Sequence, residues 1–221
     1  MKQKDVVLAM LENHALLAML RMPSADDALE MAEVLIEAGI LCVQVPMTVP
    51  GAIEVIVELE RTYGERALIG AGTVLESKTA DACLQAGAQF IVSPLMNPGT
   101  IGRCNEAGVA IVAGALTPTE IYAARHAGAD MVRIFPCAAM GGASYIRFVR
   151  APMPDIPLLP AGGVSLQTAA DYISAGATAL EVDIDLVDLD ALHGGRSHDI
   201  VTNAHLYLEV AKQAQAMSNR L

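Results

Sequence analysis

The chain has 221 residues, a formal net charge of −11 and a hydrophobic fraction of 53%. This hydrophobic fraction excludes an intrinsically disordered chain. The acidic balance disfavours nucleic acids and anionic membranes as partners, because few basic side chains are present to neutralise phosphates. No apolar stretch reaches the roughly 18 residues that cross a bilayer, and the four scattered cysteines lack metal-ligand spacing. We therefore expect a cytoplasmic protein with reduced cysteines, built as a single domain over residues 1–221.

A short amphipathic helix is predicted at the N-terminus, in the segment MKQKDVVLAMLENH. Beyond it the chain repeats one pattern, in which a helix ends, Ala-Gly follows and an apolar run begins. A glycine at that point suits the left-handed position that closes a helix. The repeat recurs with a period of about 20–25 residues, which is the length of one βα unit. Its copies lie at 37–45, 85–93, 106–114, 126–134 and 174–182, with a looser copy at 62–70.

Strands are predicted near residues 16–20, 41–45, 67–70, 89–92, 109–112, 130–134, 157–159 and 179–183. Helices are predicted between and after them near 25–38, 50–61, 77–86, 98–107, 118–127, 144–149, 166–175 and 199–216. Strands that alternate with helices indicate an α/β protein with a parallel sheet. Eight such units in about 200 residues predict a (β/α)8 barrel. A doubly wound open sheet is the alternative, although it would normally show five or six strands.

Functional residues of a (β/α)8 barrel lie at the carboxyl ends of its strands. The Gly162–Gly163 pair after the seventh strand suits a phosphate cradle, in which backbone N–H groups approach an anion closely, or equally a tight turn. A small-molecule ligand is expected at these strand ends. The candidate residues are Arg21, Gln44, Thr48, Gly72, Thr73, Ser93, Pro94, Arg133, Phe135, Gly162 and Gly163.

Three acids alternate with apolar residues in the eighth strand, TALEVDID. The outer face of a barrel strand packs under helices, so Val182 and Ile184 should face outward, and Glu181, Asp183 and Asp185 should face the interior or the mouth. Like charges at this spacing repel unless cations meet them. Two interpretations of these acids remain open: an ion-pair network that closes the barrel, or a site for a cation, an amine or a divalent metal. The later acids of the run, Asp185, Asp188 and Asp190, could instead belong to a solvated loop.

At this point the motifs resemble those of the 2-keto-3-deoxy-6-phosphogluconate / 4-hydroxy-2-oxoglutarate aldolases. The resemblance covers residues 15 to 187. It is carried by AMLRMPSADDALEMAEVLIEAGI (18–40), GAGTVL (70–75), GAQFIVSP (87–94), the IFP and GG of 134–142, and PAGGVS (160–165). It implies a homotrimer of (β/α)8 barrels that cleaves a 2-keto-3-deoxy sugar acid, often phosphorylated, to pyruvate and an aldehyde.

Several residues depart from the pattern that the resemblance implies. The lysine that forms a Schiff base in the family corresponds to Arg133, and a guanidinium stays protonated and is not a practical nucleophile. The glutamate that acts as general acid/base corresponds to Gln44, which does not titrate. An arginine or asparagine of relatives corresponds roughly to Thr48. The threonine or valine that relatives carry before the glycine pair corresponds to Ala161. The Gly-rich turn that completes the phosphate cup is replaced by Val182-Asp183-Ile184.

Two hypotheses about function remain. The first is a carbon–carbon lyase that acts on a small non-phosphorylated 2-oxo acid without a Schiff base, with Arg133, Gln44, Asp183 and Asp185 as catalytic residues. The second is a non-catalytic member of the family that binds a small ligand as a sensor or partner subunit. No cofactor is expected, although Glu181, Asp183 and Asp185 could hold a divalent metal. Asp183 and Asp185 are expected to contact Arg21, Arg133 or a bound cation, which would repel a phosphate.

Overall fold

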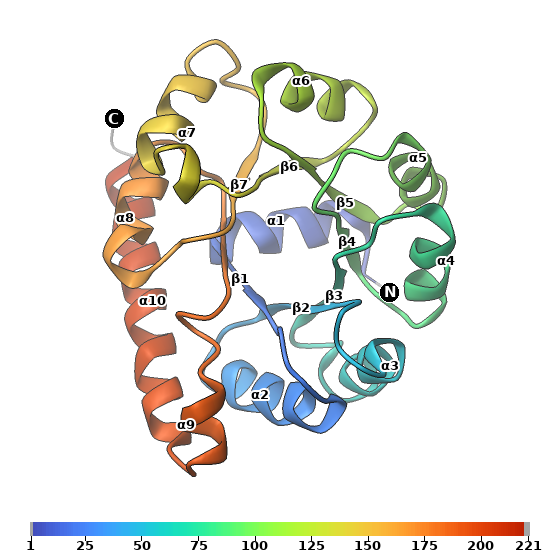
Figure 1. Ribbon diagram of the computed structural model, residues 1–221, viewed down its shortest axis with the longest axis vertical. Helices are drawn as coiled ribbons and strands as arrows, with labels where there is room; N and C mark the ends of the chain where they lie inside the picture. The colour runs from blue at the N-terminus through green and yellow to red at the C-terminus, as the bar shows by residue number, and fades with distance from the viewer. Residues whose placement is uncertain (1, 219–221) are drawn as a thin grey trace.

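The computed structural model describes residues 2–218. Eight parallel strands form a nearly closed barrel in the order β7-β6-β5-β4-β3-β2-β1-β8, and helices surround it (Figure 1). The backbone N–H of Thr178, just before β8, donates to the carbonyl of Leu158 in β7 at 2.8 Å and so links the two edge strands. The strands are β1 (Leu16–Met19), β2 (Cys42–Pro46), β3 (Leu68–Gly72), β4 (Phe90–Val92), β5 (Ala110–Ala115), β6 (Met131–Ile134), β7 (Leu158–Pro160) and β8 (Leu180–Val182).

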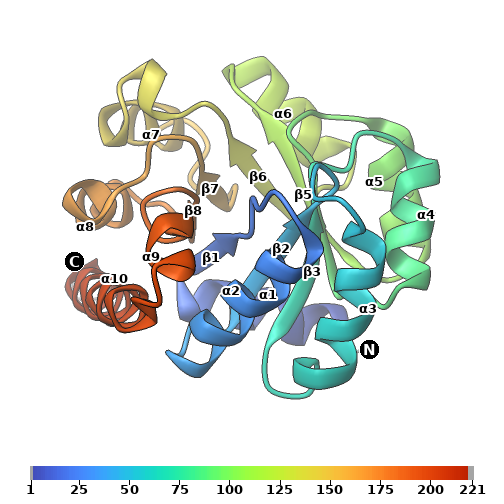
Figure 2. The same ribbon diagram turned by 60° about the horizontal axis from the view of Figure 1, so that its bottom comes forward.

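The helices include every one that the sequence predicts, with ends within two residues of the expected ones. Two further short elements, η1 and α9, were not predicted; they have three and five residues, too few to show a helical period. The long α10 packs beside α8 and α2 (Figure 2). The helices are α1 (Lys4–His14), α2 (Ala25–Glu37), α3 (Ala52–Tyr63), α4 (Ser77–Gln85), α5 (Pro98–Glu106), α6 (Pro118–His126), η1 (Ala138–Met140), α7 (Ala143–Arg150), α8 (Leu166–Ser174), α9 (Leu189–His193) and α10 (Ser197–Ser218).

The repeated glycines close their helices in the left-handed backbone region. Gly39, Gly87 and Gly176 have φ angles of 95°, 96° and 99°, which a residue with a Cβ adopts only at a steric cost. Gly64, in the looser copy of the repeat, differs because it ends α3 with a φ of −60°. The repeat therefore marks a common helix-to-strand turn, and its weakest copy is a different turn.

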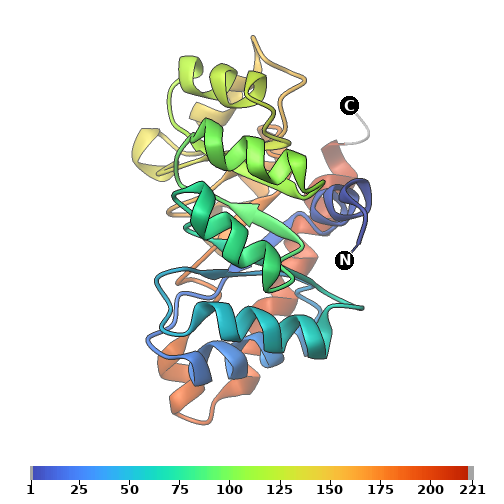
Figure 3. The same cartoon turned by 90° about the vertical axis from the view of Figure 1, so that its right-hand side faces the viewer.

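Helix α1 closes the amino-terminal end of the barrel (Figures 1 and 3). Val7 and Leu11 of this helix are fully buried and join a hydrophobic cluster with Leu17 and Phe90 of the strands. A Cβ on Gly70 would lie 2.3 Å from the Phe90 ring, so the glycine makes room for that ring inside the barrel. Side chains of α1 therefore fill the barrel interior at its amino-terminal end. No helix within residues 2–218 is both long and apolar enough to cross a membrane.

We expect Leu11→Ala to lower the free energy of unfolding by about 2–5 kcal/mol, because it leaves a cavity beneath the barrel. Chemical denaturation with a linear extrapolation measures this change. Glu12→Ala, on the exposed face of the same helix, is the matched control and should change the free energy by less than about 0.5 kcal/mol. Equal effects of the two substitutions would show that α1 does not seal the interior.

Candidate active site

A cavity of about 210 Å³ opens at the carboxyl end of the barrel. Two arginines line it, Arg133 from β6 and Arg21 from the loop that follows β1. Eight of the residues predicted from the sequence line it, and Met19 and Val92 line it without having been predicted. Its walls consist of Met19, Arg21, Gln44, Thr48, Thr73, Val92, Pro94, Arg133, Phe135 and Glu181.

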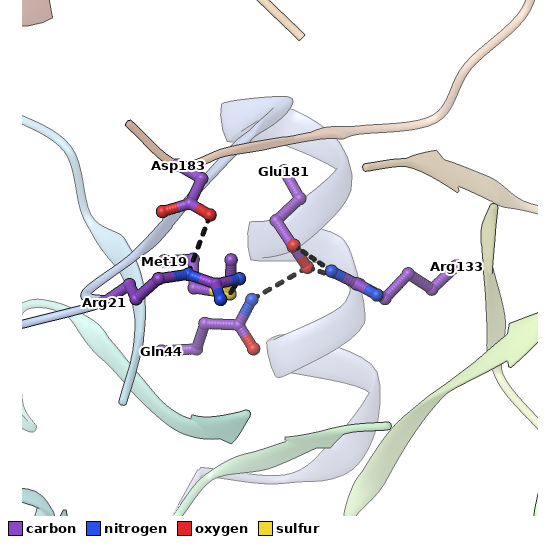
Figure 4. Close-up of polar contacts among 6 residues, drawn as sticks. All are labelled: Met19, Arg21, Gln44, Arg133, Glu181 and Asp183. Carbon is purple, nitrogen blue, oxygen red and sulfur yellow. Dashed lines mark hydrogen bonds and ion pairs between the residues drawn. The ribbon is translucent and has the colours of Figure 1, made fainter. Parts of the chain in front are cut away.

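The floor of this cavity holds a buried ion pair between Arg133 and Glu181 (Figure 4). Arg133 is 4% exposed and Glu181 is 2% exposed. The Nε of Arg133 donates to Oε2 of Glu181 at 2.8 Å, and its Nη2 donates to Oε1. Removing two charges from water is costly, and a bidentate geometry is what offsets that cost. The carboxylate of Glu181 therefore balances the charge of Arg133 and fixes the position of its guanidinium.

Gln44 of β2 completes the polar floor. Its Nε2 donates to Oε2 of Glu181 at 2.8 Å, which fixes the orientation of the amide, since a flipped amide would set its oxygen against the carboxylate. The Oε1 of Gln44 is buried and has no hydrogen-bond partner among the described residues. Gly72 lies so close that a Cβ there would be 2.4 Å from this oxygen. Gly72 therefore supports the site by leaving space for Gln44, not by lining the cavity.

Phe135 fixes the guanidinium of Arg133 from a second side. The centre of the guanidinium lies 4.2 Å from the centroid of the Phe135 ring, a cation–π contact. Glu181 engages two of the five N–H groups of the guanidinium. Arg133 is also one of the residues that line the cavity.

A second ion pair lies at the mouth. The Nε of Arg21 donates to Oδ2 of Asp183 at 3.1 Å, and these side chains are 53% and 24% exposed. Burial raises the pKa of the Asp183 carboxyl; Arg21 opposes this shift and Glu181 adds to it. Together with the Arg133–Glu181 pair, this contact gives ion pairs between two acids of the eighth-strand segment, Glu181 and Asp183, and two arginines.

Asp185 corrects the sequence-based prediction, because it contacts neither arginine. Its Oδ2 accepts hydrogen bonds from the backbone N–H of Leu166 at 3.0 Å and from the hydroxyl of Tyr207. Ile184 is 78% exposed and does not pack under a helix, whereas Val182 is fully buried as predicted. The physical reason is that β8 ends at Val182, so the alternation of faces stops before Ile184.

A second cavity, of about 450 Å³, lies between the loop after β7 and the loop after β8. Gly162 and Gly163 lie here and not in the first cavity, with φ angles of 78° and 86°. Asp183 and Asp185 also line it, and Glu181 lines both cavities. The two cavities are thus neighbours. The lining residues of the second are Gly162, Gly163, Val164, Ser165, Glu181, Asp183, Ile184 and Asp185.

The comparison with family models identifies the relatives of this barrel. Residues 7–202 match the model of the aldolase family described as KDPG and KHG aldolase. The chain belongs to this family. It is 37% identical over 172 residues to the 2-dehydro-3-deoxy-6-phosphogalactonate aldolase of Escherichia coli, a match that covers 77% of this chain and 83% of that protein. It is 33% identical to the 2-dehydro-3-deoxy-phosphogluconate aldolase of Treponema pallidum, over 74% of this chain and 78% of the relative.

Solved structures of KDPG/KHG aldolase relatives share the fold. The structure described as native KDPGal superposes with a TM-score of 0.81 at 32% identity, and the match covers 90% of this chain and 95% of that one. A 4-hydroxy-2-oxoglutarate / 2-dehydro-3-deoxyphosphogluconate aldolase also gives a TM-score of 0.81, at 28% identity, over 92% and 98% of the two chains. These matches confirm the predicted family and the (β/α)8 barrel. The expected cytoplasmic location and homotrimer stay predictions.

The lysines of this KDPG/KHG aldolase relative lie outside the cavity. Lys2 donates to the carbonyls of Gly64 and Ala67, and Lys4 pairs with Asp130 at 2.9 Å. Lys78 lies in the first turn of α4, and Lys212 lies in α10. None of these four, which are all the lysines of the sequence, lines the cavity that holds Arg133.

The remaining predicted residues have mixed positions. Thr73 lines the cavity and has a φ of 54°, a strained backbone for a residue with a branched Cβ and a feature that gathers at functional sites. Ser93 is buried, does not line either cavity, and its Oγ accepts from the N–H of Leu95 at 3.3 Å. The pairing of Glu181 with Arg133 was missed as a specific contact. Its signal was the position of Glu181 on the inward face of the eighth strand.

The three acids of the eighth-strand segment do not converge as metal ligands. Glu181 is engaged by Arg133, Asp183 by Arg21, and Asp185 by Leu166 and Tyr207. Within residues 2–218, no group of three or more His, Cys, Asp or Glu residues is arranged to hold a metal ion. Each carboxylate therefore has a separate protein partner.

We expect Glu181→Gln to lower the free energy of unfolding by about 3–5 kcal/mol, because it leaves the Arg133 charge buried without its partner. Chemical denaturation measures the change. The double variant Arg133→Met/Glu181→Leu removes both charges and should cost less than Glu181→Gln alone. Glu58→Gln, which breaks an exposed pair with Arg61, is the control and should cost no more than about 1 kcal/mol. A cost for Glu181→Gln as small as that of the control would contradict the buried-pair interpretation.

Proposed function

We propose that the chain is a carbon–carbon lyase that cleaves a small, non-phosphorylated 2-oxo acid without a Schiff base. The observation that carries this proposal is the buried guanidinium of Arg133, fixed by Glu181 and Phe135 on the wall of a cavity that no lysine lines. Membership of an aldolase family supports the class of reaction. By the resemblance, Arg133 stands where relatives carry their Schiff-base lysine.

Arg133 can replace the missing iminium by electrostatic means. In a retro-aldol step the base takes the proton of the 4-hydroxyl, the C3–C4 bond breaks, and an aldehyde leaves. The electron pair of that bond moves into the enolate of the 2-oxo acid, and C3 is protonated afterwards. Donors fixed in a site of low dielectric stabilise such an enolate oxygen without reorganising. The free donors of Arg133, held in place by its two partners, meet this requirement.

Asp183 is the group that we assign to proton transfer. Gln44 does not titrate, and Glu181 is engaged by Arg133 and Gln44. Asp183 lies at the mouth, and burial raises the pKa of its carboxyl. A general base is more effective when its pKa lies closer to the working pH, so this shift favours Asp183 as the base. Arg21 beside it provides a cation for the substrate carboxylate. Asp185 is left out of the catalytic set because it contacts α8 and α10.

The size and charge of the site support a small ligand without a phosphate. A volume of about 210 Å³ is below the roughly 300–1,000 Å³ of pockets for drug-sized ligands. The N–H of Leu166, at the start of α8, already donates to the carboxylate of Asp185. A phosphate beside Asp183 or Asp185 would meet a like charge, which costs roughly 4 kcal/mol at 4 Å and an effective dielectric of 20.

A non-catalytic ligand-binding role is the second candidate. The observation that favours it is that both arginines are already paired inside the protein, Arg133 with Glu181 and Arg21 with Asp183. Under this alternative the cavity binds a small acid, and no carbon–carbon bond breaks. Release of pyruvate from 4-hydroxy-2-oxopentanoate by the purified protein distinguishes the two candidates, and no cofactor or added metal is expected to be required.

We expect no covalent trapping when the protein is treated with pyruvate and borohydride, because no lysine lines the cavity. Intact-mass measurement followed by peptide mapping is the readout. The double variant Arg133→Lys/Glu181→Gln places an amine in the cavity without a carboxylate partner and should give an adduct at position 133, which shows that the reaction conditions detect one. An adduct on Lys2, Lys4, Lys78 or Lys212 of the unaltered protein would refute the mechanism.

The pH dependence of pyruvate release tests the role of Asp183. The base must be ionised, so the rate should rise with pH through the pKa of Asp183, which burial raises above that of an ordinary aspartate. Asp183→Asn should lower kcat by about 10²–10⁴-fold and remove this rise with pH. Asp190→Asn, in α9 and outside both cavities, is the control. It should leave kcat and the rise of the rate with pH unchanged. A rise that survives in Asp183→Asn assigns proton transfer elsewhere.

A further inference from the structure

The segment that follows β8 forms a tight turn with Asp183 at its start. The backbone carbonyl of Asp183 accepts from the N–H of Leu186 at 3.0 Å and from the N–H of Val187 at 3.1 Å. Leu186 is fully buried and anchors the far end of the turn, whereas Ile184 is 78% exposed and does not anchor it by packing. The position of the Asp183 carboxylate therefore depends on how the residues between Asp183 and Leu186 are held.

Asp185 is the residue at which two helices hold this turn. The N–H of Leu166, at the start of α8, donates to Oδ2 of Asp185 at 3.0 Å, and the hydroxyl of Tyr207 donates to the same oxygen. The side-chain amide of Asn203 donates to the backbone carbonyl of Asp185 at 2.6 Å. Donors from α8 and α10 thus fix both the side chain and the backbone of a residue that lies two positions from Asp183.

The two donors from α10 occupy one face of that helix. Asn203 and Tyr207 are four residues apart in α10, and residues with this spacing lie one turn above the other. The match to the family model covers residues 7–202, and both donors follow that range. The turn is therefore held in part by residues of this chain that the family match does not include.

We propose that Tyr207 is a positioning residue for the lyase reaction, which acts through Asp185 to hold the turn that carries Asp183. This inference rests on the proposed function for the role of Asp183 as the base. Tyr207 lines neither cavity, so it does not touch the substrate. Its contribution is to keep the carboxylate of Asp183 at the mouth, where Oδ2 accepts from Nε of Arg21 at 3.1 Å.

The surroundings of Tyr207 suit a permanent donor. Its side chain is fully buried, and burial together with the carboxylate of Asp185 raises the pKa of its hydroxyl. The hydroxyl therefore keeps its proton at every pH at which Asp183 titrates. A hydrogen bond from a hydroxyl to a carboxylate is also stronger than one between neutral groups. Tyr207 can thus hold Asp185 in both protonation states of the base.

Tyr207→Phe tests the proposal, because it keeps the buried ring and removes only the donor to Asp185. Amide hydrogen exchange of Leu186 and Val187 is the first measurement, since their N–H groups close the turn on the carbonyl of Asp183. We expect both amides to exchange about tenfold faster in the variant. Tyr172→Phe is the matched control, because Tyr172 is also buried and its hydroxyl contacts Cys137, outside the turn. It should leave the exchange of both amides unchanged.

The rate of pyruvate release separates positioning from a general effect on stability. We expect Tyr207→Phe to lower kcat about tenfold, because the base is held less precisely. In the Asp183→Asn background the same substitution should not lower kcat further, since Tyr207 acts through the carboxylate that is already absent. Asn203→Ala removes the donor to the backbone of Asp185 without changing the buried ring, and it should reproduce both effects if Tyr207→Phe does not fold.

The outcomes distinguish this inference from the proposed function. Unchanged exchange of Leu186 and Val187 in Tyr207→Phe overturns the inference, and so does a loss of kcat that persists in full in the Asp183→Asn background. An unaltered protein that releases no pyruvate refutes the proposed function and the catalytic role of Tyr207 with it, whereas the exchange rates still decide whether Tyr207 holds the turn. Faster exchange, together with a loss of kcat that disappears in Asp183→Asn, establishes Tyr207 as a positioning residue.

Discussion

The buried pair of Arg133 and Glu181 is the interaction on which the rest of this site depends. A guanidinium that is 4% exposed is tolerated only with a matched anion, and Glu181 supplies it with a bidentate contact. That contact in turn requires a donor, not a second carboxylate, at Gln44. Gln44 needs the space that Gly72 leaves beside its Oε1. One buried charge thus constrains residues on four strands, β6, β8, β2 and β3.

The segment that supplies Glu181 also carries the acids that make the contacts at the mouth of the barrel. Glu181 lies beside Leu17 in the pairing of β1 with β8, so the strand that supplies the buried anion also helps to close the barrel. Two residues later Asp183 meets Arg21, which follows β1. Asp185 then ties the loop to α8 and α10 through Leu166 and Tyr207. Three acids at alternate positions therefore perform three different tasks, and the division follows from where β8 ends.

The sequence predicts the fold almost completely because the glycine repeat reports each helix-to-strand turn locally. Gly39, Gly87 and Gly176 mark the expected turns through their positive φ angles. The site is predicted less well because its contacts depend on the ends of strands. The alternation rule held for Val182, which is buried, and failed for Ile184 and Asp185, since hydrogen bonding of β8 had already ended. Sequence patterns give the face of a strand residue, but not the residue at which the strand stops.

The choice of partner for Arg133 was beyond sequence reasoning for a different reason. Arg133 is on β6 and Glu181 on β8, and β7 lies between them, so no cross-strand register links the two residues. Their contact depends on the lengths of both side chains and on how the barrel curves. Gln89 shows the same limit elsewhere, since this buried amide accepts from Lys2 and donates to Glu60, residues that no repeat or motif connects to it.

Arg133, Glu181 and Gln44 make physical sense only as a set. An amine at position 133 opposite Glu181 would be held in its protonated form by the carboxylate and so would be a poor nucleophile. A carboxylate at position 44 opposite Glu181 would place two anions at the distance now spanned by a hydrogen bond of 2.8 Å, and one of them would take up a proton. Neither change alone produces a lysine with a nearby base. The chemistry of this barrel is therefore determined by how charge is distributed among β2, β6 and β8 together, and an activity assigned from any one of these positions would neglect the other two.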